Sequence, residues 1–241
     1  MMNIIYSEFL KLKKSNIMLI VLIGGISMSL LMFTARLVTE THMSFENYAY
    51  NIEQINYLLL YVVLFSLISA YVFSREFTEK TANVLYCYPV SRIKIFIAKI
   101  FIIYILISLV YVIEVASILL SYYFLNGNFP AGHLIIKDIK ANLCSLIFQF
   151  LLVPIPILIA NISKNIMIPT VFGILAFIIS GVFSSYSGYI KYMPLLTPFT
   201  SVKYFYLSEY INFNYIIISG SLCFLFFMTI SIYEFNKKDI D

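Results

Sequence analysis

Long apolar runs without charged residues make up most of this chain. Five runs that lack Asp, Glu, Lys and Arg are 21 to 26 residues long: 15–35, 54–74, 141–163, 165–190 and 210–233. A sixth stretch, 100–125, is interrupted only by Glu114. About 20 mostly apolar residues are enough for one helix to cross the hydrocarbon core of a bilayer. The pattern therefore predicts six membrane-spanning segments.

These segments are predicted to be helices. Inside a bilayer every backbone N–H and C=O needs a partner within the protein, so only helices and closed barrels can span it. Barrel strands are about 10 residues long and alternate in polarity, whereas these runs are longer and apolar on all sides. We predict an all-α membrane protein with one membrane domain over residues 1–241, with spans at approximately 16–36, 54–74, 100–125, 141–163, 165–188 and 210–233.

The composition supports lipid as the surrounding solvent. Hydrophobic residues make up 61% of the chain and charged residues only 12%, where soluble domains carry about 25% charged residues. The sparse basic residues give no support for nucleic-acid binding. The three cysteines and two histidines lack the spacing of a metal site or a disulfide framework. We therefore expect no metal site.

The basic residues predict the orientation in the membrane. With six spans, the two termini, the second loop and the fourth loop share one side, and that side holds 11 of the 16 Lys and Arg residues. Lysine and arginine are enriched in cytoplasmic loops. Both termini are therefore predicted to be cytoplasmic.

An amphipathic helix is predicted at the N-terminus. Apolar and polar residues would occupy opposite faces of that helix, Ile5, Phe9 and Leu12 against Ser7, Lys11 and Lys14. This arrangement is typical of a helix that lies at the membrane interface with its lysines toward acidic lipids.

The connection 75–99 between the second and third spans is also amphipathic. If it is helical, its two faces are Phe77, Thr81, Val84, Leu85 and Tyr88 on one side and Glu76, Glu79, Lys80, Asn83 and Cys87 on the other. Pro89 would end this helix. One interpretation is a solvated turn at the lipid surface. The other is a docking helix whose polar face contacts a cytosolic partner.

Glu114 is the acidic residue that lies well within a predicted span. Exposure to lipid would cost at least a few kcal/mol, so it should face the bundle interior, a subunit interface or water, or else be protonated. It either contacts a substrate or a polar residue across a dimer interface, or forms a structural hydrogen bond. The chain has no phosphate-binding loop and no hydrolase motif, so we expect that it is not an enzyme and that its energy comes from another protein.

Several segments resemble type-2 ABC exporter permeases. The loop from Arg75 to Arg92 has the acidic residue, Thr, Leu and Pro-x-x-Arg pattern of that family's first cytoplasmic loop, and Lys99 stands where a lysine opens the third span. Residues 7–14 resemble the family's amphipathic entry helix. Ala82 departs from the Gly or Thr often found nearby. The six-span layout with both ends inside is also similar, so the resemblance covers the whole chain.

The resemblance implies partners and a coupling site. Such permeases dimerise, with a second copy or a sister permease, and bind two cytosolic ATPase subunits through the loop helix. ATP and Mg would be bound by the ATPase subunits, and the permease itself would hold no cofactor. The residues implied in ATPase coupling are Glu76, Glu79, Lys80, Thr81, Asn83, Leu85 and Arg92, and Glu114 is a candidate for the translocation interface.

The short external loops and the Lys-, Ile- and Tyr-rich composition resemble one branch of the family. That branch contains the bacitracin-resistance, lantibiotic-immunity and toxin-peptide exporters of Gram-positive bacteria. It implies a multi-pass protein of the plasma membrane that moves or expels antimicrobial peptides or similar lipid-like cargo. The alternatives are a non-transporting membrane assembly or sensor subunit and, less favoured, an intramembrane enzyme.

Overall fold

The computed structural model describes residues 2–13, 15–39, 43–79, 81, 91–184, 193–209 and 211–237. Within these ranges the secondary structure is helical, without a strand. Six helices are long and apolar enough to cross a membrane: Ile17–Thr39, Phe45–Thr78, Arg92–Asn126, Gly132–Ser163, Met167–Ser184 and Phe213–Lys237. The predicted all-α, six-span class is confirmed.

The first half of the chain contains three spans. Helix α1 (Met2–Lys13) precedes the first span, α2 (Ile17–Thr39), and the second span consists of α3 (Phe45–Ile55), the π-helical η1 (Asn56–Leu60) and α4 (Tyr61–Thr78). The third span is α6 (Arg92–Asn126). It ends at Gly127, which has a φ of 73° and donates its N–H to the Tyr123 carbonyl. Glycine adopts this left-handed conformation without a Cβ clash.

Proline divides the fourth span. Helix α7 (Gly132–Leu152) is followed by α8 (Pro154–Ser163), because Pro154 has no N–H and cannot continue the hydrogen-bond ladder. The remaining elements are α9 (Met167–Ser184), the short 3₁₀ turn η2 (Pro194–Leu196), α11 (Thr197–Leu207) and the last span α12 (Phe213–Lys237).

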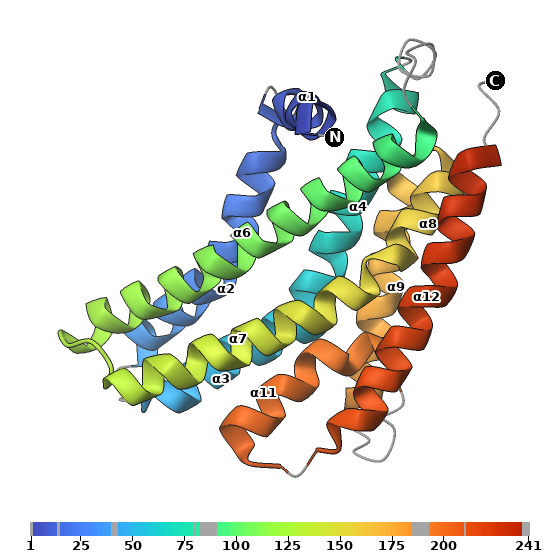
Figure 1. Cartoon of the computed structure of the whole chain (residues 1–241). Coiled ribbons are helices and arrows are strands. Elements are labelled where there is room, and N and C mark those ends of the chain that lie inside the picture. The colour runs from blue at the N-terminus through green and yellow to red at the C-terminus, as the bar shows by residue number, and fades with distance from the viewer. Residues whose placement is uncertain are drawn as a thin grey trace.

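The helices pack as a bundle in which neighbours in space are often distant in sequence (Figure 1). Helix α6 contacts α1 and α2, α4 contacts α8 and α9, α7 contacts α11, and α8 contacts α12. The α2–α6 contact is close at Gly25, where a Cβ atom would lie 2.7 Å from Ile113. Together these contacts form one main apolar core and a smaller one around α3.

The bundle has two ends that carry different chemistry. Helix α1, the end of α4, the start of α6 and the end of α12 lie at one end (Figure 1), and Arg92 donates a hydrogen bond of 2.9 Å to the Asn236 carbonyl. We call this the α1 end. The opposite end, formed by α3, the start of α7 and α11, is called the distal end. The cytoplasmic location of the α1 end stays a prediction from the charge distribution.

Several helices extend well beyond the charge-free runs that predicted them. The second span begins at Phe45 instead of 54, α6 at Arg92 instead of 100, and α7 at Gly132 instead of 141. At 1.5 Å per residue the second span is about 51 Å long, which exceeds the hydrocarbon thickness of about 30 Å. The additional turns bring charged residues of the predicted connections into the bundle.

Candidate functional site

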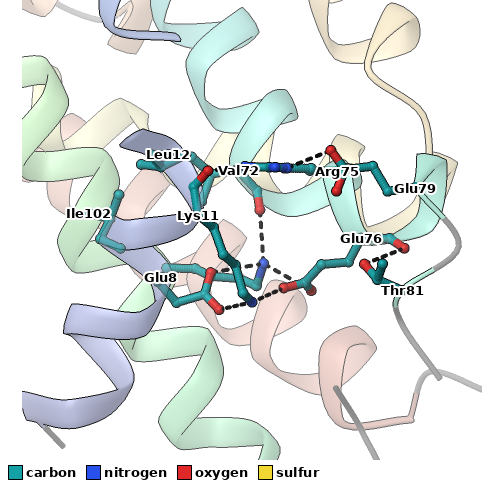
Figure 2. A pocket seen from close by; sticks show the side chains of 10 residues that line it. Glu8, Lys11, Leu12, Val72, Arg75, Glu76, Glu79, Thr81 and Ile102 are labelled. Carbon is teal, nitrogen blue, oxygen red and sulfur yellow. Dashed lines mark hydrogen bonds and ion pairs between the residues drawn. The ribbon is translucent and has the colours of Figure 1, made fainter. Parts of the chain in front are cut away.

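A buried ion-pair network joins α1, α4 and α6 at the α1 end of the bundle (Figure 2). Lys99 on α6 is 1% exposed. Its Nζ lies 3.0 Å from Glu76 Oε2 and 3.6 Å from Glu8 Oε2, and it donates a 2.9 Å hydrogen bond to the Val72 carbonyl. Lys11 lies 2.9 Å from Glu76 Oε1 and also pairs with Glu8. We call Glu8, Lys11, Glu76 and Lys99 the α1-end network.

The charges of the α1-end network cancel. Two carboxylates face two ammonium groups, so the burial cost of each ion is offset by an opposite charge. Burial disfavours the charged form of Lys11, but the adjacent Glu76 and Glu8 outweigh this effect and raise the pKa of Lys11 above its ordinary value. Loss of one member would leave a buried charge without full compensation, which is strongly destabilising. The network therefore fixes α1 against α4 and α6.

The network forms part of the wall of a cavity of about 290 Å³. Arg75 lies beside this cavity, where its guanidinium donates to the Lys11 carbonyl at 2.6 Å and to Glu79 Oε1 at 2.7 Å. The N–H of Thr81 donates to the Glu76 carbonyl at 2.9 Å. Hydrogen bonds thus connect the network to the point where the chain leaves α4.

The structure places four of the predicted coupling residues around this end. Glu76 is only 4% exposed, so it faces the bundle interior and not the exposed polar side expected for it. Glu79 is half-exposed, Thr81 follows it, and Arg92 opens α6. Lys80, Asn83 and Leu85, with the rest of the predicted docking helix up to residue 90, lie outside the described residues.

The α1-end network contains two members that the sequence patterns placed elsewhere. Lys11 was expected to face lipid headgroups, and instead it pairs with two carboxylates. Lys99 was expected at the membrane surface at the start of the third span. Instead α6 begins at Arg92, and Lys99 is buried inside this helix. Opposite charges on three separate helices give no local spacing signal that would have predicted their pairing.

Glu114 lies in a second polar network, toward the distal end. It is fully buried on α6, where its Oε1 accepts a 2.5 Å hydrogen bond from Asn56 and its Oε2 accepts one of 2.6 Å from the Tyr61 hydroxyl. Glu114 therefore faces the bundle interior, one of the three locations expected for it. Asn56 belongs to η1, and π-helical turns of this kind are frequent at functional sites.

Two further acidic residues join this network. Glu53 on α3 and Asp138 on α7 are both 0% exposed. The Tyr206 hydroxyl on α11 lies 3.0 Å from Glu53 Oε1 and 2.9 Å from Asp138 Oδ1. Asn142 donates to Glu53 Oε1 at 2.8 Å and accepts from the Tyr57 hydroxyl at 2.8 Å. We call these residues, together with Glu114, Asn56 and Tyr61, the distal network.

Sequence reasoning missed Glu53 and Asp138 because it ended each span at a charged residue. The predicted second span began at Gln54, directly after Glu53. The predicted fourth span began at Ala141, about one helical turn after Asp138. A usable signal was present, since Asn142 follows Asp138 by four residues and Asn56 follows Glu53 by three. Residues at these intervals share one helix face, so each acid continues a polar stripe.

The described residues contain no group of three or more His, Cys, Asp or Glu side chains placed to hold a metal ion. Cys144 and Cys223 are free thiols.

The fold and the two networks define a multi-pass membrane protein whose helices enclose charged and polar contacts. A family model described as ABC-2 family transporter protein matches residues 4–181. The chain belongs to this family and is therefore a membrane-embedded permease subunit of an ABC exporter. No curated protein sequence matches the chain. The family match spans α1 through most of α9 and so includes every member of both networks except Tyr206.

Proposed function

We propose that this permease moves or expels amphipathic peptides, such as antimicrobial or toxin peptides, or similar lipid-like cargo, driven by a separate cytosolic ATPase. Two ATPase subunits would bind the permease at the α1 end, and the permease would pair with a second copy or a sister permease in the plasma membrane. ATP and Mg would be bound by the ATPase subunits. Family membership supports the association with ATPase subunits. The peptide or lipid-like cargo is proposed here.

The α1-end network is the observation that supports the coupling proposal. Glu76 and Arg75 lie in the last turn of α4, directly before the loop that resembles the family's ATPase-binding segment. Glu76 is tied to Lys11 on α1 and to Lys99 on α6. A displacement of this loop by an ATPase would therefore be carried into α6 by a buried contact and into α1 by a partly buried one.

Reversal of the charge at Glu79 tests the coupling proposal. Glu79 is 48% exposed and stands where α4 ends, so Glu79→Lys should leave the permease in the membrane but abolish substrate-stimulated ATP hydrolysis by the complex. Lys80→Glu, at the next position, should have the same effect. The measurement is ATP hydrolysis by the complex purified through a tag on the permease, with and without added peptide.

Glu46→Lys is the matched control. Glu46 lies at the distal end, is 42% exposed and, like Glu79, forms an ion pair with a basic side chain, at 2.6 Å from Lys137. This variant should hydrolyse ATP as the wild type does. Normal stimulated hydrolysis in both Glu79→Lys and Lys80→Glu would refute the assignment of this segment to coupling.

The apolar faces of the peripheral spans support an amphipathic cargo. Most residues in the apolar stretches of α2, α9 and α12 are not buried, since only 28%, 22% and 17% of them are. Such faces suit contact with lipid, a second permease or a cargo that partitions into the membrane better than they suit an ion or a sugar. A bacterial host that produces the permease with its co-purifying ATPase should tolerate several-fold more of a membrane-active peptide, and an ATPase variant unable to hydrolyse ATP should remove that tolerance.

The same experiments distinguish the alternatives. A sensor or assembly subunit would bind an ATPase but change neither peptide tolerance nor peptide-stimulated hydrolysis. A permease that co-purifies with no ATPase would contradict the proposal altogether.

A further inference from the structure

The distal network holds three buried carboxylates. Glu53, Glu114 and Asp138 are each 0% exposed, and none of them forms an ion pair with a lysine or arginine of the described residues. Lys137, one residue before Asp138, instead pairs with Glu46 at 2.6 Å. The α1-end network, by contrast, contains one base for each acid. Within the part of the chain that the structure describes, the distal network therefore lacks positive charge.

Its unpaired atoms point to a missing hydrogen-bond donor. Glu53 Oε2, Asp138 Oδ2 and Asn56 Oδ1 are buried without a hydrogen-bond partner among the described residues. The Tyr111 hydroxyl is also unpartnered, although the residue is only 3% exposed. Tyr111 precedes Glu114 by one turn of α6, so both share one helix face. Buried polar atoms are rarely left unpaired in folded proteins.

The contact at Tyr206 shows where the donor is missing. A tyrosine hydroxyl carries one proton, yet the oxygen of Tyr206 lies within 3.0 Å of both Glu53 Oε1 and Asp138 Oδ1. It can donate to only one of them. Two ionised carboxylates that both contact one hydroxyl would also repel each other strongly in an environment of low dielectric constant. One additional proton on the pair removes both difficulties, because it supplies a second donor and cancels one charge.

We propose that Glu53 and Asp138 form a proton-binding site that holds one proton between them, with Tyr206 bridging the two carboxyl groups. A proton suits the site better than a metal ion or an ammonium group, because the carboxylate oxygens already lie at hydrogen-bond distance from a common hydroxyl and a proton requires no additional space. The reaction is simple protonation of one carboxylate, with no bond broken. This proposal does not depend on the identity of the cargo.

Other ionisable groups lie on the elements that pack around the pair. They are Glu46 and Tyr50 on α3, Tyr57 on η1, Tyr61 on α4, Tyr111 and Glu114 on α6, Lys137 on α7, and Lys203 and Tyr206 on α11. The lysines have other acidic partners, Lys137 with Glu46 and Lys203 with Glu209 at 3.9 Å. The two carboxyl groups come from α3 and α7, and the bridging hydroxyl comes from α11. Proton binding should therefore favour the arrangement in which these three helices are in contact.

Infrared difference spectroscopy of the full permease in lipid nanodiscs tests the proposal. A protonated carboxyl group has a carbonyl stretching band that is separate from the bands of carboxylates. The wild type should show such a band at neutral pH and lose it at alkaline pH. Glu53→Gln and Asp138→Asn each leave a single carboxylate with an amide donor beside it, so each variant should lose the band contributed by the pair.

Glu46→Gln is the matched control. It changes an acid on the same helix α3 that is exposed and paired to a lysine, so it should retain the band. Tyr206→Phe keeps both acids and should retain the band at a shifted frequency, which gives a second variant if either amide variant fails to fold. Absence of the band in the wild type at neutral pH, or its persistence at unchanged intensity in both amide variants, would overturn the proposal. Either outcome would leave the exporter assignment intact, because ATP hydrolysis is measured separately.

Discussion

Replacement of Lys99 by methionine should destabilise the permease substantially. Lys99 is 1% exposed and lies 3.0 Å from Glu76 Oε2 and 3.6 Å from Glu8 Oε2. Methionine fills a similar volume but carries no charge. The variant therefore leaves two buried carboxylates with Lys11 as their one remaining cationic partner in the network, and it also removes the hydrogen bond to the Val72 carbonyl.

The magnitude follows from the burial of the charges. Removal of one partner from a buried ion pair costs about 3–5 kcal/mol. Lys11 remains 2.9 Å from Glu76 Oε1 and continues to compensate part of the charge, so we expect a value near the lower limit, about 3 kcal/mol. Glu79→Gln removes a member of an exposed pair instead, since Glu79 is 48% exposed. Such pairs contribute about 0–1 kcal/mol.

The assay is the free energy of unfolding of the permease in mixed micelles, measured for the two single variants Lys99→Met and Glu76→Gln and for the double variant. Removal of both charges leaves Glu8 paired with Lys11, so the double variant should be clearly more stable than the sum of the single effects predicts. The coupling energy between positions 76 and 99 should be at least about 1 kcal/mol, within the range measured for residues in contact.

Two outcomes would refute this reasoning. One is a Lys99→Met variant that is no less stable than Glu79→Gln. The other is strict additivity in the double variant, which would mean that Glu76 and Lys99 do not interact and that the destabilisation arises from packing alone.

Three further predictions concern other contacts. Gly25→Ala should lower the free energy of unfolding of the permease by about 1–3 kcal/mol through overpacking, because its Cβ would lie 2.7 Å from a side chain of α6. Gly181→Ala, which has open space around it, should stabilise α9 by about 0.5–1 kcal/mol in the same unfolding assay. Tyr57→Phe removes the 2.8 Å hydrogen bond to the buried Asn142 Oδ1 and should lower the free energy of unfolding by about 1–3 kcal/mol. Tyr104→Phe removes only a 3.5 Å contact with the Phe150 carbonyl and should leave the stability nearly unchanged. The raised pKa of Lys11 means that its stabilisation of α1 is complete below the unfolded value of 10.5 and is lost as the pH rises through the higher folded value. Spin labels on α1 and α4, the helix that carries Glu76, should therefore stay close at neutral pH and separate only at pH values above 10.5.

The fold could be predicted because lipid imposes one strong rule on sequence. Runs of about 20 apolar residues have few structural solutions in a bilayer, and the six predicted spans correspond to the six observed ones. The span limits could not be predicted in the same way. A charged residue predicts the end of an apolar span, but Glu53, Lys99 and Asp138 are buried inside helices, where polar side chains and carbonyls of other helices contact them.

The candidate site was predicted only in part for the same physical reason. Glu114 was recognised because its neighbours are apolar for a full span, so a lone charge there needs an explanation. Glu76 and Lys99 lie beside other charged residues, and their sequence context resembles an ordinary surface connection. Whether a charged residue in such a connection faces the bundle interior depends on contacts among α1, α4 and α6, which are helices far apart in sequence. Hydrophobic periodicity does not encode such contacts.

The two networks are mechanically connected through α4 and α6. Lys99 and Glu114 lie on the same helix and are separated by about 22 Å at 1.5 Å per residue, and Glu76 and Tyr61 mark the two ends of α4 in the same way. A rotation of α4 against α6 would therefore disturb the contacts of Glu76 with Lys99 at one end and of Tyr61 with Glu114 at the other. The charges at the α1 end balance, so that end resists separation, whereas the distal end depends on a proton and should respond to pH. A permease built in this way would receive the motion of an ATPase at one end and express it as a change in proton affinity at the other.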